Sequence, residues 1–247
     1  MGSDAESHHQ TLDELRRKMA AVPGRGELSA ARVPRSAELR REPLAVPAAL
    51  AGLLPEGGLV KGSVVAYTGA SSLLAGLLAA VTESGGHAAL VGVPRLGLLA
   101  AVEMGAKLER LAVVADPGPD PVEVAAVLLD GLDLIVLGLG GGAVAPARTR
   151  VIAARARSRG ATLVVTDGHW SNPAMRIAAR TAGYGGLGVG SGRVRTVGLE
   201  VEVRTRSAPP RHGRIVLRPT AGRVEWIAVE QAAPVTELPL DASGAAS

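Results

Sequence analysis

The sequence has no cysteine and no phenylalanine, and it has only two tryptophans and two tyrosines. The absence of cysteine excludes disulfide bonds, thiolate zinc sites and cysteine nucleophiles. With so few aromatic rings, the hydrophobic core has to be built from alanine, valine and leucine. The chain also lacks a charged-then-apolar signal segment and a run of about 18 apolar residues, so we expect a cytoplasmic protein that does not contact a membrane.

Positive charge is unevenly distributed along the chain. The formal net charge is only +4, but the stretch from Arg148 to Arg218 holds 14 arginines against three acidic residues, a net of +11. Such asymmetry indicates a surface for a polyanion or for an acidic protein. A solvated face that keeps the protein in solution would produce the same pattern.

Composition divides the chain into three parts. Residues 1–43 are expected to form an N-terminal helix and a basic linker, residues 44–231 the main domain, and residues 232–247 a disordered tail. The helix begins with a capping box of Thr11 and Glu14. Because a helix this short is marginal in water, it should dock on its own domain or on a partner. The apolar stripe available for that contact is Leu12, Leu15 and Met19.

Strand and helix patterns alternate between residues 63 and 166, which predicts an α/β fold with a mainly parallel central sheet flanked by helices. A Gly-rich segment without clear periodicity follows over residues 168–192, and the chain then ends in antiparallel strands. Strands are expected at 63–68, 87–92, 111–115, 132–137, 162–166, 193–204, 214–217 and 223–229, and helices at 71–83, 97–104, 121–130 and 146–158.

The stretch from Gly57 to Ala80 has the layout of a phosphate-binding P-loop: a turn, a buried strand, a small-residue loop and a helix. If Gly69 is the first glycine of G-x-x-x-x-G-K-[ST], the second glycine, the lysine and the hydroxyl residue fall on Leu74, Ala75 and Gly76. Ser71 and Ser72 lie inside this degenerate loop. The charges that hold phosphate and Mg²⁺ are missing, so we expect the loop to be collapsed or filled by its own side chains.

Residues 57–69, GGLVKGSVVAYTG, resemble the start of the RecA-family core, and the order of elements from Leu44 to Val229 resembles that family topologically. The resemblance implies a RecA-like core in which Pro94 occupies the position of the catalytic glutamate. Gly138 replaces the Walker B aspartate, and the polar sensor falls near Asp167. Because four catalytic positions are lost together, we expect no ATP hydrolysis, no catalytic residue, no bound cofactor and no metal.

With its degenerate RecA-like core, its size and its short N-terminal helix, this chain resembles the ImuA family, including the actinobacterial branch of that family. That resemblance implies a non-catalytic accessory protein of damage-induced mutagenesis, in the SOS response and translesion synthesis. Its partners would be ImuB, an inactive Y-family polymerase homologue, through ImuB an error-prone C-family DNA polymerase, and DNA. A cell-division inhibitor of the SulA type is the alternative, because SulA-type proteins are also RecA-like cores without the ATPase residues.

The Gly-rich segment corresponds, in the RecA layout, to the loops that meet single-stranded DNA. Arginines there would contact phosphates, and an aromatic ring would stack on a base. An acidic patch on a protein partner would suit the same side chains. The candidates for DNA or partner contact are Arg176, Arg180, Tyr184, Arg193 and Arg195.

A residual nucleotide-binding enzyme, for ATP or NAD(P), is the remaining alternative. The run from Gly138 to Ala143 matches G-x-G-x-x-[GA] after a strand, with Asp167 as the acid for a ribose. Against NAD(P), Pro146 delays the helix, and the motif follows the fourth strand rather than the first. Asp167 and His169 could form an acid–base pair, but no nucleophile motif accompanies them, and a loop anchored by Trp170 explains them better.

Overall fold

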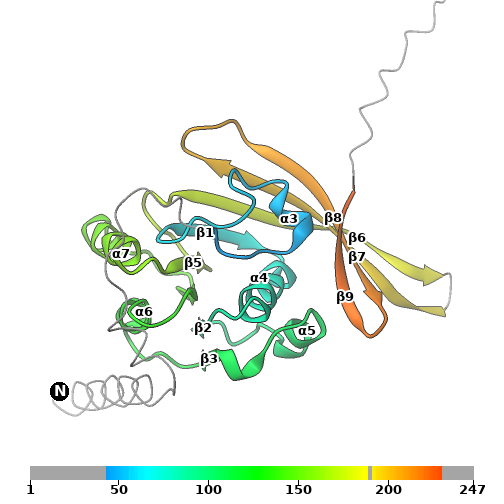
Figure 1. The fold of residues 1–247 in the computed structure, drawn as a ribbon, viewed down its shortest axis with the longest axis horizontal. Coiled ribbons are helices and arrows are strands. Elements are labelled where there is room, and N and C mark those ends of the chain that lie inside the picture. The colour runs from blue at the N-terminus through cyan, green and yellow to red at the C-terminus, as the bar shows by residue number, and fades with distance from the viewer. Residues whose placement is uncertain (1–42, 189–190, 230–247) are drawn as a thin grey trace, which may run out of the picture.

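The computed structural model describes residues 43–188 and 191–229, which form one nine-stranded sheet in the order β3-β2-β4-β5-β1-β6-β7-β8-β9 (Figure 1). Neighbouring strands are parallel from β3 to β6 and antiparallel from β6 to β9. This arrangement confirms the predicted fold class. The strands are β1 (Val64–Gly69), β2 (Ala88–Val91), β3 (Leu111–Val114), β4 (Leu134–Gly138), β5 (Thr162–Thr166), β6 (Met175–Gly188), β7 (Ser191–Thr205), β8 (Arg211–Thr220) and β9 (Arg223–Val229).

Helices cover both faces of the parallel part of the sheet. The helices are α3 (Ala48–Ala51), α4 (Ser71–Glu83), α5 (Leu98–Glu103), α6 (Pro121–Leu128) and α7 (Pro146–Arg159), with a 3₁₀ turn at Leu108–Arg110. One hydrophobic cluster lies between α4 and one face of the sheet, and it continues along the same face of β6, β7 and β8. The second cluster joins α6 and α7 to the opposite face. Strands β2, β4 and β5 are therefore buried on both sides, which explains their continuous apolar runs. The edge strand β3 and the outer face of β6 are partly exposed.

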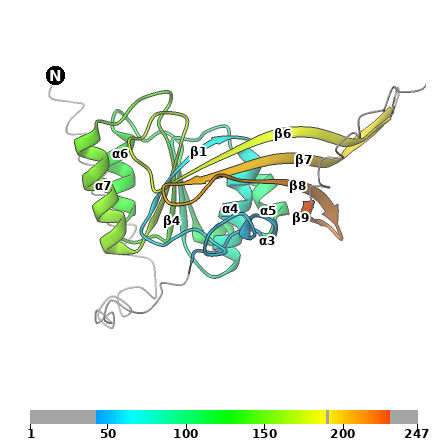
Figure 2. The ribbon, with the colours of Figure 1, turned by 90° about the horizontal axis from the view of Figure 1, so that it is seen from above.

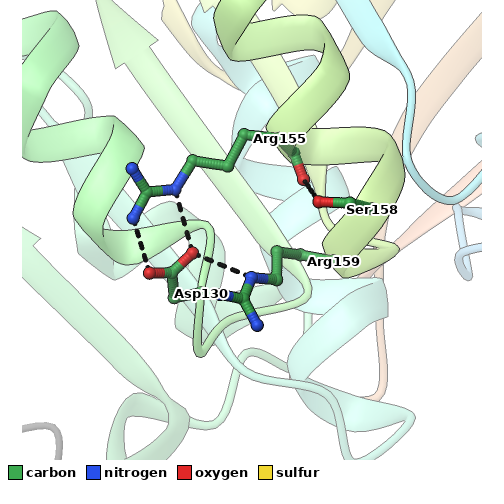
Figure 3. A network of polar contacts seen from close by, with 4 residues as sticks. All are labelled: Asp130, Arg155, Ser158 and Arg159. Carbon is green, nitrogen blue, oxygen red and sulfur yellow. Dashed lines mark hydrogen bonds and ion pairs between the residues drawn. The ribbon is translucent and has the colours of Figure 1, made fainter.

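A carboxylate network holds α6 and α7 side by side (Figure 3). Asp130, just after α6, accepts hydrogen bonds from Arg155 Nε at 2.9 Å and Nη2 at 2.5 Å. Arg159 Nε lies 3.1 Å from the same carboxylate. The hydrogen bonds from Arg155 lower the pKa of Asp130 below its ordinary value. Two of the many arginines of the basic stretch thus have a structural role.

The prediction of an aperiodic loop over residues 168–192 was wrong. Met175–Gly188 forms the long strand β6, which pairs with β7 in a hairpin that projects beyond the helical layers (Figure 2). Glycines hid the strand pattern, because the register shifts between Thr181 and Gly183 and again between Gly185 and Leu187. Such irregularities bend and twist a strand without ending it. The expected DNA-contact loop is therefore a pair of strands.

The N-terminal part of the prediction lies outside the described residues. This applies to the expected helix with Leu12, Leu15 and Met19, to the basic linker, and to the tail from residue 232. The first described residues fold back onto the core, where Leu44 and Leu59 pair through hydrogen bonds of 2.7 and 3.2 Å. No helix in the described ranges is long and apolar enough to cross a membrane.

Candidate functional site

The junction between β1 and α4, where a P-loop would lie, is a single residue long. Gly69 ends β1 and Ser71 begins α4, with Ala70 between them. The N–H of Ala70 donates a hydrogen bond of 2.9 Å to the carbonyl oxygen of Ala179 in β6. A Cβ atom on Gly69, whose φ is +109°, would lie 1.8 Å from that same oxygen. The backbone of β6 therefore packs directly against this one-residue junction.

Tyr67 supports this junction from inside the core. Its side chain is 1% exposed, and its hydroxyl donates a hydrogen bond to the carbonyl oxygen of Ala70. Burial raises the pKa of Tyr67 above its ordinary value, so the neutral hydroxyl is the form that the fold requires. The last strand residues and the first helix residues are thus held together by both main-chain and side-chain bonds.

The three positions that carry the second half of a P-loop motif lie within α4 and pack against other elements. Leu74 and Ala75 are 3% and 1% exposed. A Cβ atom on Gly76 would lie 2.2 Å from Cζ2 of Trp226, so this glycine lets β9 pack directly on α4. Of the loop serines, Ser71 is exposed and Ser72 is half-buried. These residues form a packed helix–strand contact in place of a nucleotide cradle.

Three further positions, to which the resemblance assigns the catalytic glutamate, the Walker B aspartate and the polar sensor, meet in one open cleft of about 520 Å³. Pro94 follows β2, Gly138 ends β4 and Asp167 follows β5, and all three line this cleft. The connections after β2 and β4 leave toward opposite sides of the sheet. Open α/β sheets usually bind their ligands at such a switch point. The cleft is therefore in a functional position, but Pro94 and Gly138 stand where the resemblance places acids, and Asp167 is the one carboxylate among its lining residues.

The glycine motif after β4 is built into a loop instead of a helix terminus. The N–H of His169 donates to the carbonyl oxygen of Gly142 at 2.8 Å, and the N–H of Gly141 donates to that of Asp167 at 2.7 Å. α7 begins only at Pro146. A dinucleotide fingerprint needs its glycines next to a helix N-terminus, because the helix binds the pyrophosphate. The geometry of this loop does not match that requirement.

Asp167 and His169 are both exposed, whereas Trp170 is 2% exposed and belongs to the cluster under α6 and α7. Asp167 has a φ of +51°, a conformation that aspartate tolerates in turns. Trp170 thus anchors a surface loop. Among the described residues, no group of three or more histidine, aspartate or glutamate side chains is placed to hold a metal ion.

The predicted DNA-contact residues do not form one surface. Arg176 pairs with Ala66 of β1 and with Arg204 of β7, and it is exposed on the sheet face that α6 and α7 partly cover. Tyr184 pairs with Val197, which packs with the α4 cluster, so its 61%-exposed ring lies on the opposite face. Arg180 lies with Arg176, and Arg193 and Arg195 lie in β7 near the hairpin tip.

An apolar strip, which sequence reasoning missed, lies at the β3 edge of the sheet. Leu99 and Val102 of α5 are 71% and 40% exposed, and Val113 of β3 is 47% exposed. Val113 pairs with Leu90 of the α4 cluster, so it lies on the same side of the sheet as α5. An edge strand beside exposed apolar side chains is a common place for protein contacts. The sequence signal was weak, because buried and edge strands both read as short apolar runs.

Comparisons with known proteins place the chain in a family. Residues 52–172 match a family model described as the MT3502 N-terminal domain. Over 208 residues the chain is 48% identical to Rv3395c, an uncharacterized protein of Mycobacterium tuberculosis, a match that covers 81% of this chain and 95% of that protein. A KaiC-like protein of the archaeon Pyrococcus horikoshii has a similar structure, with a TM-score of 0.49, 13% identity, and coverage of 76% of this chain and 99% of that one. The extent of the match to Rv3395c shows that this chain belongs to the same family as that protein.

Proposed function

We propose that this protein is a non-catalytic accessory protein of the ImuA type, which acts in damage-induced mutagenesis by binding an ImuB-like inactive polymerase homologue. One observation supports the proposal: the backbone of β6 packs against the one-residue β1–α4 connection, at the place where a P-loop would lie. In this proposal the sheet is retained as a scaffold without the charged residues that bind Mg-ATP, and the function is carried by surfaces that bind other macromolecules. An error-prone C-family polymerase would join the assembly through ImuB.

The apolar strip of Leu99, Val102 and Val113 is the surface that we assign to the protein partner. Exposed apolar side chains at a sheet edge favour contact with another polypeptide, because burying them releases water and the free strand edge can accept hydrogen bonds. The stripe of Leu12, Leu15 and Met19 is a second candidate for the same contact. Substitutions made separately in the two surfaces show which of them binds the partner.

Capture of ImuB by the tagged full chain tests the proposal. Nuclease-treated lysate containing both proteins should yield a complex at micromolar concentration. Leu99→Asp/Val113→Asp should abolish capture, whereas Val151→Asp, at an apolar α7 residue that is 66% exposed, should not. Loss of capture with Leu15→Asp alone would assign the contact to the N-terminal helix. Absence of any complex with the unchanged chain would contradict the proposed partner.

The SulA-type and nucleotide-binding alternatives have their own readouts. A cell-division inhibitor would produce filamentous cells on overexpression, and the accessory role predicts cells of normal length. The cleft at Gly138 and Asp167 is the one observation that favours a residual nucleotide site. An absorbance and calorimetric titration with NAD(P) would detect such a site, and the accessory role predicts no saturable signal.

A further inference from the structure

We propose that a basic surface formed by α7 and the outer face of β6–β8 binds the phosphate backbone of duplex nucleic acid. This basic surface consists of Arg150 and Arg157 on α7, Arg176 and Arg180 on β6, Arg204 on β7 and Arg214 on β8, all of them exposed. The inference extends the proposed accessory function and rests on it for its biological setting. The placement of the charges does not depend on that function.

Strand register shows that the arginines of β6, β7 and β8 share one face. Arg176 pairs with Ala66, and Val64, two residues before Ala66 on β1, belongs to the cluster under α6 and α7. Paired residues of neighbouring strands point to the same side of a sheet, as do residues two or four apart on one strand. The same rule places Arg204 beside Arg176, its partner on β7. Arg180 is four residues from Arg176 and pairs with Glu200, which in turn pairs with Arg214, so all four arginines share this face.

The flank of α7 adds to the same side. Ile152 and Ala156 are buried against the sheet, and Arg155 faces α6 through its bond to Asp130. With 3.6 residues per turn, Arg150 and Arg157 fall on the flank of α7 away from α6. That flank faces β1, because α7 follows β4 and packs over β5, and β6 is the next strand beyond β1. The cluster under α6 and α7 contains no residue of β6–β9 among those described, so the outer face of these strands is open (Figure 2).

The positive charge of this surface is only partly neutralised. Two acidic residues, Glu200 and Glu202, lie among the arginines and are bonded to Arg180 and Arg204. In the described part of the chain, no salt bridge gives a carboxylate partner to Arg150, Arg176 or Arg214. The α7 sequence PARTRVIAARARSR contains no acidic residue. The surplus is positive, which suits an extended polyanion.

The geometry favours a nucleic acid backbone over stacked bases. Arginines four residues apart on a strand are about 13 Å apart, and those on alternate strands about 10 Å apart, so the guanidinium groups spread over two dimensions. Tyr184, which could stack on a base, lies on the opposite face. Guanidinium groups without an aromatic partner position a backbone and do not read sequence. We therefore expect binding of duplexes without sequence preference and with strong salt dependence.

Anisotropy titrations of a labelled duplex of about 30 base pairs over a range of salt concentrations test this surface. Arg150→Gln/Arg176→Gln in the full chain should weaken binding about tenfold and make the salt slope less steep by about two. The control, Arg95→Gln/Arg195→Gln, removes the same charge from the cleft and the hairpin tip and should change affinity less than about twofold. Circular dichroism should show that both variants are folded.

Four results would overturn the proposal. The first three are equal weakening by the control variant, no salt-dependent duplex binding by the unchanged chain, and preferential binding of single strands that is lost in Tyr184→Ala. The fourth is competition by polyglutamate as effective as that by DNA, which would assign the surface to an acidic protein. Capture of ImuB by the Arg150→Gln/Arg176→Gln variant, measured after nuclease treatment, distinguishes this inference from the proposed function. The variant should capture ImuB as well as the unchanged chain does, because the protein contact lies elsewhere. Failure of duplex binding would therefore leave the proposed partner untouched.

Discussion

The N–H of Ala70 and the carbonyl oxygen of Ala179 form a hydrogen bond of 2.9 Å between the start of α4 and the middle of β6. In a P-loop protein, backbone N–H groups at this point would face phosphates. Here one of them is used inside the sheet, and the strand–helix connection is shortened to one residue. The same contact therefore stabilises the fold and, in the proposed function, takes the place of a phosphate contact.

Gly69→Ala should destabilise the protein severely. Its Cβ would meet the Ala179 carbonyl oxygen at 1.8 Å, at a φ of +109° that side chains rarely adopt. We expect a loss of more than about 3 kcal/mol, or failure to fold, from combined clash and backbone strain. Gly57→Ala is the control, since that glycine also has a positive φ but has no atom within 4 Å of its Cβ position. Its cost should be about 1 kcal/mol. Urea unfolding measures both, and equal costs would contradict the close approach of β6.

A double-mutant cycle tests the packing of Trp226 on Gly76. Gly76→Ala alone should destabilise the protein, because the new Cβ would lie 2.2 Å from the indole. In the Trp226→Ala background the same change should stabilise the helix by up to about 1 kcal/mol, the difference in helix propensity between glycine and alanine. The effect of Gly76→Ala on the free energy of unfolding should therefore change sign. If the sign stays the same, β9 does not pack on α4 in this way.

Tyr67 should remain un-ionised at alkaline pH for as long as the protein is folded. Burial raises the pKa of this residue, and a group whose pKa is raised in the folded state stabilises the fold below its unfolded pKa. That stabilisation is lost as pH rises beyond the ordinary tyrosine value of about 10. In Tyr184→Phe, which leaves Tyr67 as the one tyrosine of the chain, absorbance at about 295 nm should rise only together with unfolding. Ionisation in a folded protein would show that water reaches the hydroxyl.

Asp130 should make a small, pH-dependent contribution to stability. Its pKa is lowered by the hydrogen bonds from Arg155, so its contribution is present above the unfolded pKa of about 4 and is lost as pH falls through the folded pKa. Because the pair is partly exposed, Asp130→Asn should cost only about 0.5–1 kcal/mol at neutral pH. The cost should vanish in acid. If the difference in the free energy of unfolding between the unchanged chain and Asp130→Asn is constant from neutral to acidic pH, the ion pair is not the cause of that difference.

Much of the α/β core was predictable, because its strands and helices differ clearly in period and length. The helix from Ser71 to Glu83 and the strand from Thr162 to Thr166 have the boundaries expected from the sequence. The 3₁₀ turn at Leu108–Arg110 and the short α3 were not predicted. Elements of three or four residues carry too few apolar positions to show a period.

The candidate site was less predictable, because it depends on long-range pairing. The loss of phosphate chemistry could be seen from Leu74, Ala75 and Gly76, but the closure of the junction depends on β6, which lies more than a hundred residues later. The glycines of β6 concealed that strand. Pairing in the sheet also determines which arginines share a face. The positions of residues along the sequence could not show that Arg176 and Tyr184 lie on opposite faces of the sheet.

Calorimetric titration of the full chain with Mg-ATP tests the central claim most directly. The closed β1–α4 junction predicts no saturable heat up to millimolar nucleotide, because phosphates find neither space nor cations between β1, α4 and β6. Micromolar, saturable binding of Mg-ATP that is lost in Ser72→Ala would contradict the account, since it would require this junction to open and bind the nucleotide.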